Sequence, residues 1–71
     1  MIIYVNEKQV DVDERTTVAT LLQSLGYPDR GVAVALDLSL VPRSEWATRL
    51  SEFGGPSGPL RFEVVTAVQG G

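Results

Sequence analysis

The stretch that decides the fold is Thr16-Thr-Val-Ala-Thr-Leu-Leu-Gln-Ser-Leu-Gly26. Its apolar residues recur at positions i, i+3, i+4 and i+7, namely Val18, Leu21, Leu22 and Leu25. This spacing predicts a helix with one apolar face, capped by Thr16 or Thr17 and ended by Gly26 in a left-handed conformation. A helix this short does not persist alone in water. We therefore expect it to pack on a sheet.

The residues before the helix predict an antiparallel hairpin. Met1, Ile3 and Val5 share one face at period two, and Val10 and Val12 repeat the pattern. A polar turn over residues 6–9, with Lys8 as a solvated turn residue, connects the two strands.

The residues after the helix alternate between strand signals and turn signals. The dense apolar run Val32–Leu36 predicts a strand buried on both faces. Residues 37–39 turn it back into a short strand at Leu40 and Val41, although Asp37-Leu38 leaves the turn type open. We expect one or two helical turns over residues 44–50, with Ser44 as the cap and with Trp46 and Leu50 on one side.

Near the end of the chain, a loop precedes a last strand. Residues 54–59 read Gly-Gly-Pro-Ser-Gly-Pro, which predicts an exposed loop. Leu60, Phe62 and Val64 then alternate with Arg61 and Glu63, and the strand is expected to continue to Val68.

This order of elements predicts an α+β chain with the β-grasp layout. About five strands form a mixed sheet, and one main helix packs across one face. The last strand is expected to lie beside the first. We expect residues 1–67 to form the domain and residues 68–71 to form a flexible tail.

Composition narrows the possible functions. The chain has 71 residues, which suffices for one small domain. Because it has neither Cys nor His, the usual nucleophiles, general bases and metal ligands are missing, so we expect no enzyme and no bound metal. A net charge of -3 disfavours nucleic acid as a partner. No stretch is long and apolar enough for a membrane span, so we expect a cytoplasmic protein that is monomeric when free.

The chemistry is expected at the end of the chain, Gln69-Gly70-Gly71. Glycine has no Cβ, so two glycines can enter a channel too narrow for other residues. Extended, Val68 to Gly71 span about 13 Å, enough to reach a site inside a second protein. The α-carboxylate of Gly71 is unhindered, and ATP can convert it to an acyl adenylate. Chance or a cloning remnant also explains a terminal glycine pair.

Three stretches carry a resemblance that covers nearly the whole chain. They are Met1-Ile-Ile-Tyr-Val-Asn6, then Val41-Pro-Arg43 with Glu45-Trp-Ala47, and Glu63-Val-Val-Thr-Ala-Val-Gln-Gly-Gly71. In these stretches the chain resembles the ThiS family of ubiquitin-like sulfur carriers in bacterial thiamin biosynthesis. The chain departs from the family at residues 54–59, which form a longer loop, and at Asp37-Leu38, where relatives often have Asn-Gly.

The resemblance implies a carrier and the proteins that act on it. A ThiF-like adenylyltransferase would use ATP and magnesium to adenylate Gly71. A cysteine desulfurase or sulfurtransferase would supply persulfide sulfur, which makes the terminus a thiocarboxylate. ThiG, the thiazole synthase, would then accept the sulfur, with Gly70, Gln69 and Val68 lying in the partner's channel.

Other residues are candidates for partner contacts. Arg43 in the matched stretch either binds a partner carboxylate or phosphate, or packs its stem over Trp46 or pairs with Glu45 in water. We expect Trp46 itself to belong to the core. Val65 and Ala67 are expected on the face away from the helix, where a partner can cover them.

Two alternative functions remain open at this point. One is the small subunit of molybdopterin synthase, a MoaD-like protein that uses the same kind of tail. The other is a ubiquitin-like modifier or a plain interaction module.

Overall fold

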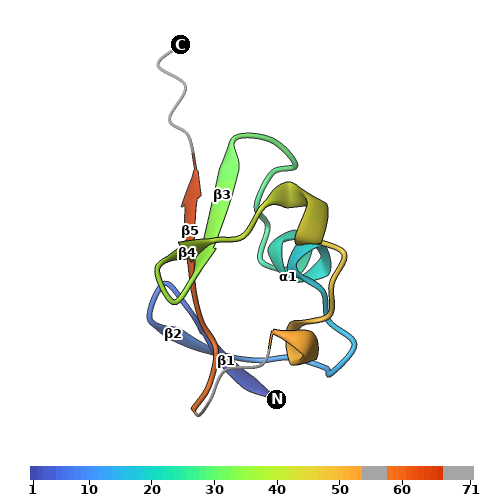
Figure 1. Cartoon of the computed structure of the whole chain (residues 1–71), viewed down its shortest axis with the longest axis vertical. Helices are drawn as coiled ribbons and strands as arrows, with labels where there is room; N and C mark the ends of the chain where they lie inside the picture. The colour runs from blue at the N-terminus through green and yellow to red at the C-terminus, as the bar shows by residue number, and fades with distance from the viewer. Residues whose placement is uncertain (54–57, 67–71) are drawn as a thin grey trace.

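A mixed five-stranded sheet with the strand order β2-β1-β5-β3-β4 forms the body of the molecule (Figure 1). The computed structural model describes residues 1–53 and 58–66. In chain order, the elements of this part are β1 (Ile2–Val5), β2 (Lys8–Asp11), α1 (Val18–Ser24), β3 (Val32–Leu36), β4 (Ser39–Leu40), the 3₁₀ turns η1 (Arg43–Glu45) and η2 (Leu50–Glu52), and β5 (Arg61–Thr66).

The last strand lies between the first and the third. β5 runs parallel to β1, with Val5 opposite Phe62, and antiparallel to β3, with Val34 opposite Val64. β2 and β4 pair antiparallel to β1 and β3 and form the two edges. The predicted α+β, β-grasp architecture, with the last strand beside the first, is confirmed.

One of the two threonines predicted to cap helix α1 does so. Thr17 is the N-cap: its Oγ1 accepts from the Thr20 amide at 3.1 Å, and Thr20 Oγ1 accepts from the Thr17 amide at 2.9 Å. These reciprocal bonds satisfy amides that a helix start leaves unpaired. Gly26, with φ 86°, takes the left-handed conformation expected after the helix.

The core lies between the sheet and the layer formed by α1, η1 and η2, with the two turns above and below α1 in Figure 1. Its buried members come from almost every element: Ile3, Val5, Val18, Leu21, Leu22, Val34, Val41, Trp46, Leu50, Leu60, Phe62 and Val64. Trp46 belongs to this core, as predicted, and donates from Nε1 to the Val41 carbonyl at 3.2 Å.

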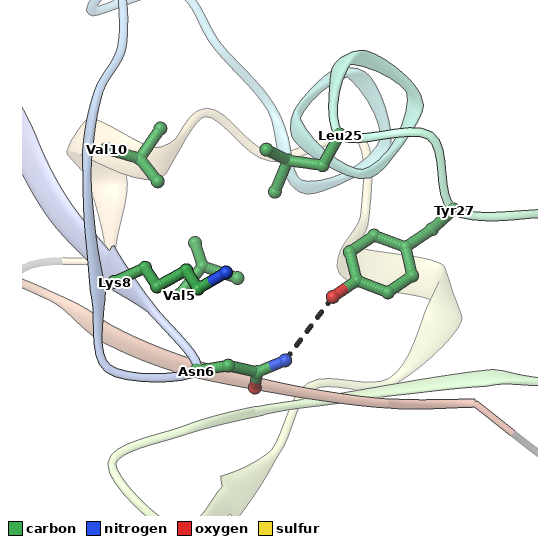
Figure 2. A pocket seen from close by; sticks show the side chains of 6 residues that line it. All are labelled: Val5, Asn6, Lys8, Val10, Leu25 and Tyr27. Carbon is green, nitrogen blue, oxygen red and sulfur yellow. Dashed lines mark hydrogen bonds between the residues drawn. The ribbon is translucent and has the colours of Figure 1, made fainter.

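The prediction that the whole apolar stripe of the helix is buried is wrong at one residue. Leu25 is 41% exposed, whereas Val18, Leu21 and Leu22 are buried. Leu25 is the C-cap of α1, so it lies past the last helical turn. Its side chain reaches only the rim of the sheet, above the β1–β2 hairpin (Figure 2).

The prediction that Val32–Leu36 is buried on both faces is also wrong. Val34 faces the core, but its neighbour Ala33 is exposed. A strand alternates its side chains between two faces, and the described residues place helical cover on only one of them. β3 therefore contains apolar residues on both of its faces, although only one face packs against the core.

Two local predictions need correction. Lys8 begins β2, opposite Val5, because Asn6 and Glu7 alone form the turn with φ of 50° and 68°. Such a two-residue turn with positive φ matches the twist of the strands it joins. Ser44 does not cap a helix, since it lies inside η1, whose N-cap Pro42 makes no side-chain hydrogen bond.

Candidate functional site

Strand β5 is the base from which the end of the chain departs. It is hydrogen-bonded to β1 on one side and to β3 on the other, and Thr66 is opposite Val32 at its end. The predicted tail residues Gln69, Gly70 and Gly71, together with Ala67 and Val68, lie outside the described residues. What the structure shows is the rigid platform that precedes them.

The face of the sheet opposite α1 carries an apolar patch, which we call the open-face patch. It comprises Ala33, Ala35, Leu40 and Val65. Val65 is opposite Ala33 and Leu40 is opposite Ala35, and directly opposed residues of antiparallel strands share a face. Val65 is 62% exposed and Leu40 is 71% exposed. The predicted exposure of Val65 is confirmed, one residue before the described part of the chain ends at Thr66.

The rest of this face is largely polar or covered, except for Ile2 of β1, which is 40% exposed at the end of the sheet away from Thr66. On β5, Glu63 is opposite Ala35, next to the patch. At the start of β5, the Arg61 guanidinium lies 4.7 Å from the centroid of the Tyr4 ring, so it covers that ring in a cation–π contact. Of the exposed apolar side chains on this face, Val65 is the one next to Thr66, whereas Leu40 lies beside the middle of β5 and Ile2 lies at the other end.

Arg43 lies elsewhere. Its guanidinium is 4.8 Å from the centroid of the Trp46 ring, and its Nη2 donates to the Asp29 carbonyl at 2.6 Å. Together with residues of α1 it borders a cavity of about 210 Å³ on the helix side of the molecule. The expected contact between Arg43 and Trp46 is thus present, and binding of a partner by Arg43 stays a prediction. The fold does not bring Arg43 and Val65 together on one face.

A second cavity, of about 240 Å³, lies between the β1–β2 hairpin and the end of α1 (Figure 2). Its lining residues are Val5, Asn6, Lys8, Val10, Leu25 and Tyr27. Among these residues, Asn6 is a candidate that the sequence analysis did not identify. Its side chain forms hydrogen bonds with Val64 of β5, which lies 58 positions later in the chain. The available signal was an Asn directly after a strand and at the start of a tight turn.

Residues 1–53 and 58–66 form neither a metal-binding cluster nor a membrane-spanning helix. Within these ranges no three side chains of Asp, Glu, His or Cys gather closely enough to hold a metal ion. None of the helices formed by the same residues has the length and apolar character needed to cross a bilayer.

Comparison with known protein families gives a match to most of the described domain. The model of the ThiS family matches residues 2–53, which is more than half of the 71-residue chain. The matched part contains strands β1 to β4, helix α1 and both 3₁₀ turns. No curated protein matches the chain.

Proposed function

Since this chain belongs to the ThiS family, whose members are small ubiquitin-like sulfur carriers, we propose that it carries sulfur for thiazole formation in thiamin biosynthesis. The observation that supports this function best is the family match together with the position of β5. That strand is paired on both sides and ends at Thr66, five positions before Gly71. The chain thus leaves the domain from the central strand of the sheet.

The proposed chemistry takes place at the Gly71 carboxylate, in a partner's active site. In a ThiF-like adenylyltransferase, a carboxylate oxygen attacks the α-phosphorus of ATP, and magnesium pyrophosphate leaves. Persulfide sulfur from a cysteine desulfurase or sulfurtransferase then attacks the acyl carbon, and AMP leaves. Cleavage of the S–S bond by a thiol reductant leaves the thiocarboxylate, which ThiG uses as its sulfur source. The carrier acts as cosubstrate and supplies no catalytic group.

The open-face patch is the proposed docking surface for the activating enzyme. Its Val65 directly precedes Thr66, the last described residue of β5, and we propose that a partner covering the patch also receives residues 67–71. Covering exposed apolar side chains such as Leu40 and Val65 contributes binding free energy that does not depend on the tail. Ala67, the other predicted contact, would extend this surface.

Intact-mass spectrometry tests the proposal. The protein is incubated with ATP, magnesium, a ThiF-like adenylyltransferase and a persulfide source. We expect a gain equal to the exchange of one oxygen for one sulfur, located at Gly71 by fragmentation. No adenylate and no mass shift would refute the carrier function.

The thiamin assignment needs a second step. The sulfurated protein is offered separately to a thiazole synthase and to the large subunit of molybdopterin synthase. Transfer to the thiazole synthase supports the proposal, whereas transfer only to the other enzyme would assign the chain to the molybdopterin pathway.

A further inference from the structure

Asn6 continues the pairing between β1 and β5 beyond the point where β1 ends. The Tyr4 amide donates to the Leu60 carbonyl at 2.9 Å, and the Asn6 amide donates to the Phe62 carbonyl, also at 2.9 Å. At Asn6 the backbone turns away with φ of 50°. The next position of β5 on this side, Val64, therefore meets no backbone of β1.

The Asn6 side chain takes the place of that missing backbone. Its Oδ1 accepts from the Val64 amide at 2.8 Å, and its Nδ2 donates to the Val64 carbonyl at 3.3 Å. A carboxamide has the same donor and acceptor as a peptide group, so it satisfies both polar groups of Val64. Without it, both groups would lose their partner at a partly buried position, which is costly.

Asparagine suits this position for two reasons. It tolerates positive φ better than other residues with a side chain, and its side chain is short enough to reach the adjacent strand. The Tyr27 hydroxyl, which follows α1, accepts from Asn6 Nδ2 at 3.3 Å (Figure 2). The carboxamide is thus held between the helix end and the last strand.

We infer that Asn6 is a positioning residue, which holds β5 at Val64 and thereby sets where the reactive end of the chain leaves the sheet. Within the described part of the chain, Thr66 is paired only with Val32 of β3, so Asn6 provides the last contact on the β1 side. This role rests on the proposed function, since it matters only if a partner must receive residues 67–71 in a defined place. A reactive group that lies about 1 Å from its productive position can react up to about 100-fold more slowly.

The test compares Asn6→Gly with the matched control Glu7→Gly. Both positions have positive φ in the same two-residue turn, so glycine relieves backbone strain at both. Only the first change removes the carboxamide, because Glu7 is exposed and makes no side-chain hydrogen bond in the described residues. Amide hydrogen exchange at Val64 and the kinetics of adenylation by a ThiF-like enzyme are measured well below the unfolding temperature of each protein.

We expect Asn6→Gly to lower the protection of the Val64 amide about tenfold or more. We also expect it to lower kcat/KM for adenylation about tenfold, with kcat falling as well as KM rising. Glu7→Gly should leave both quantities unchanged. A second variant, Asn6→Asp, keeps the acceptor for the Val64 amide but places an oxygen against the Val64 carbonyl, so an intermediate loss is expected.

The possible failures are distinguishable. If the unaltered protein is not adenylated, the proposed function falls, while hydrogen exchange still reports whether Asn6 holds Val64. Equal Val64 protection in the two glycine variants would overturn the anchoring by Asn6. Lost protection with unchanged adenylation kinetics would show that Asn6 only stabilises the fold and would overturn its positioning role.

Discussion

Val65 is opposite Ala33 on the uncovered face of the sheet, and 62% of it is exposed. An exposed valine in a central strand gains little from folding, because its apolar surface stays in water. The same surface gains free energy when a partner covers it. Under the proposed docking, Val65 thus contributes more to association than to stability.

We predict that Val65→Glu raises the KM for adenylation about tenfold, because it places a charge in the apolar contact. Steady-state kinetics with a ThiF-like enzyme checks this, with thermal unfolding measured in parallel. Gln23→Glu is the control, since it adds the same charge at an exposed position of α1 on the other side of the molecule. Equal KM values for the two variants would count against docking through the open face.

Leu38 has a backbone conformation that its side chain disfavours. It has φ of 70° and is 87% exposed, at the second position of the two-residue turn between β3 and β4. A residue with a Cβ pays for this conformation, whereas glycine does not. We predict that Leu38→Gly raises the free energy of unfolding by about 1 kcal/mol, as measured by urea denaturation.

Leu40→Gly is the matched control for this prediction. The same change is made two residues later, also at an exposed leucine, but in the extended backbone of β4. There glycine only adds freedom to the unfolded chain, so the free energy of unfolding should fall. If both variants lose stability, strain at Leu38 is not the determining factor.

At the scale of elements, the helix was predictable and its last residue was not. The period of 3.6 residues identifies Val18, Leu21 and Leu22, all buried. It also assigns Leu25 to the core, because a pattern contains no information on where the sheet ends. In the same way, the apolar run of β3 predicts a strand but not the absence of cover on one of its faces.

We predict that Leu22→Ala lowers the free energy of unfolding by about 2 to 5 kcal/mol, since it leaves a cavity between α1 and the sheet. Denaturant titration at constant pH measures this loss. Leu25→Ala is the control from the same helix, and its exposed side chain should cost much less. Similar losses at the two positions would contradict the burial difference between them.

At the scale of the whole molecule, the sequence analysis predicted the fold and proposed the terminal glycine pair as the candidate site, but it missed the contact between Asn6 and Val64. Periodicity predicts elements, and the glycine pair is visible in the sequence itself. The Asn6 contact joins residues 58 positions apart and depends on where β1 turns away from β5. The Asn at the start of a tight turn is a local signal, but it does not indicate Val64 as the partner, which only the assembled sheet reveals.

The proposed division of the molecule into a docking platform and a reacting end leads to a last prediction. A protein ending at Gln69 lacks Gly70 and Gly71 but retains every described residue. It should fold with an unchanged Tm and should not be adenylated. Because the open-face patch is intact, it should still bind the activating enzyme and inhibit adenylation of the full-length protein competitively.

The same truncation combined with Val65→Glu separates the two contributions. We expect the inhibition constant to rise about tenfold, because docking through the patch weakens while the missing terminus is common to both proteins. Competition kinetics with full-length protein as substrate measures both constants. If the shortened protein does not inhibit at all, the terminus supplies nearly all of the binding free energy, and the sheet then acts only as a support for it.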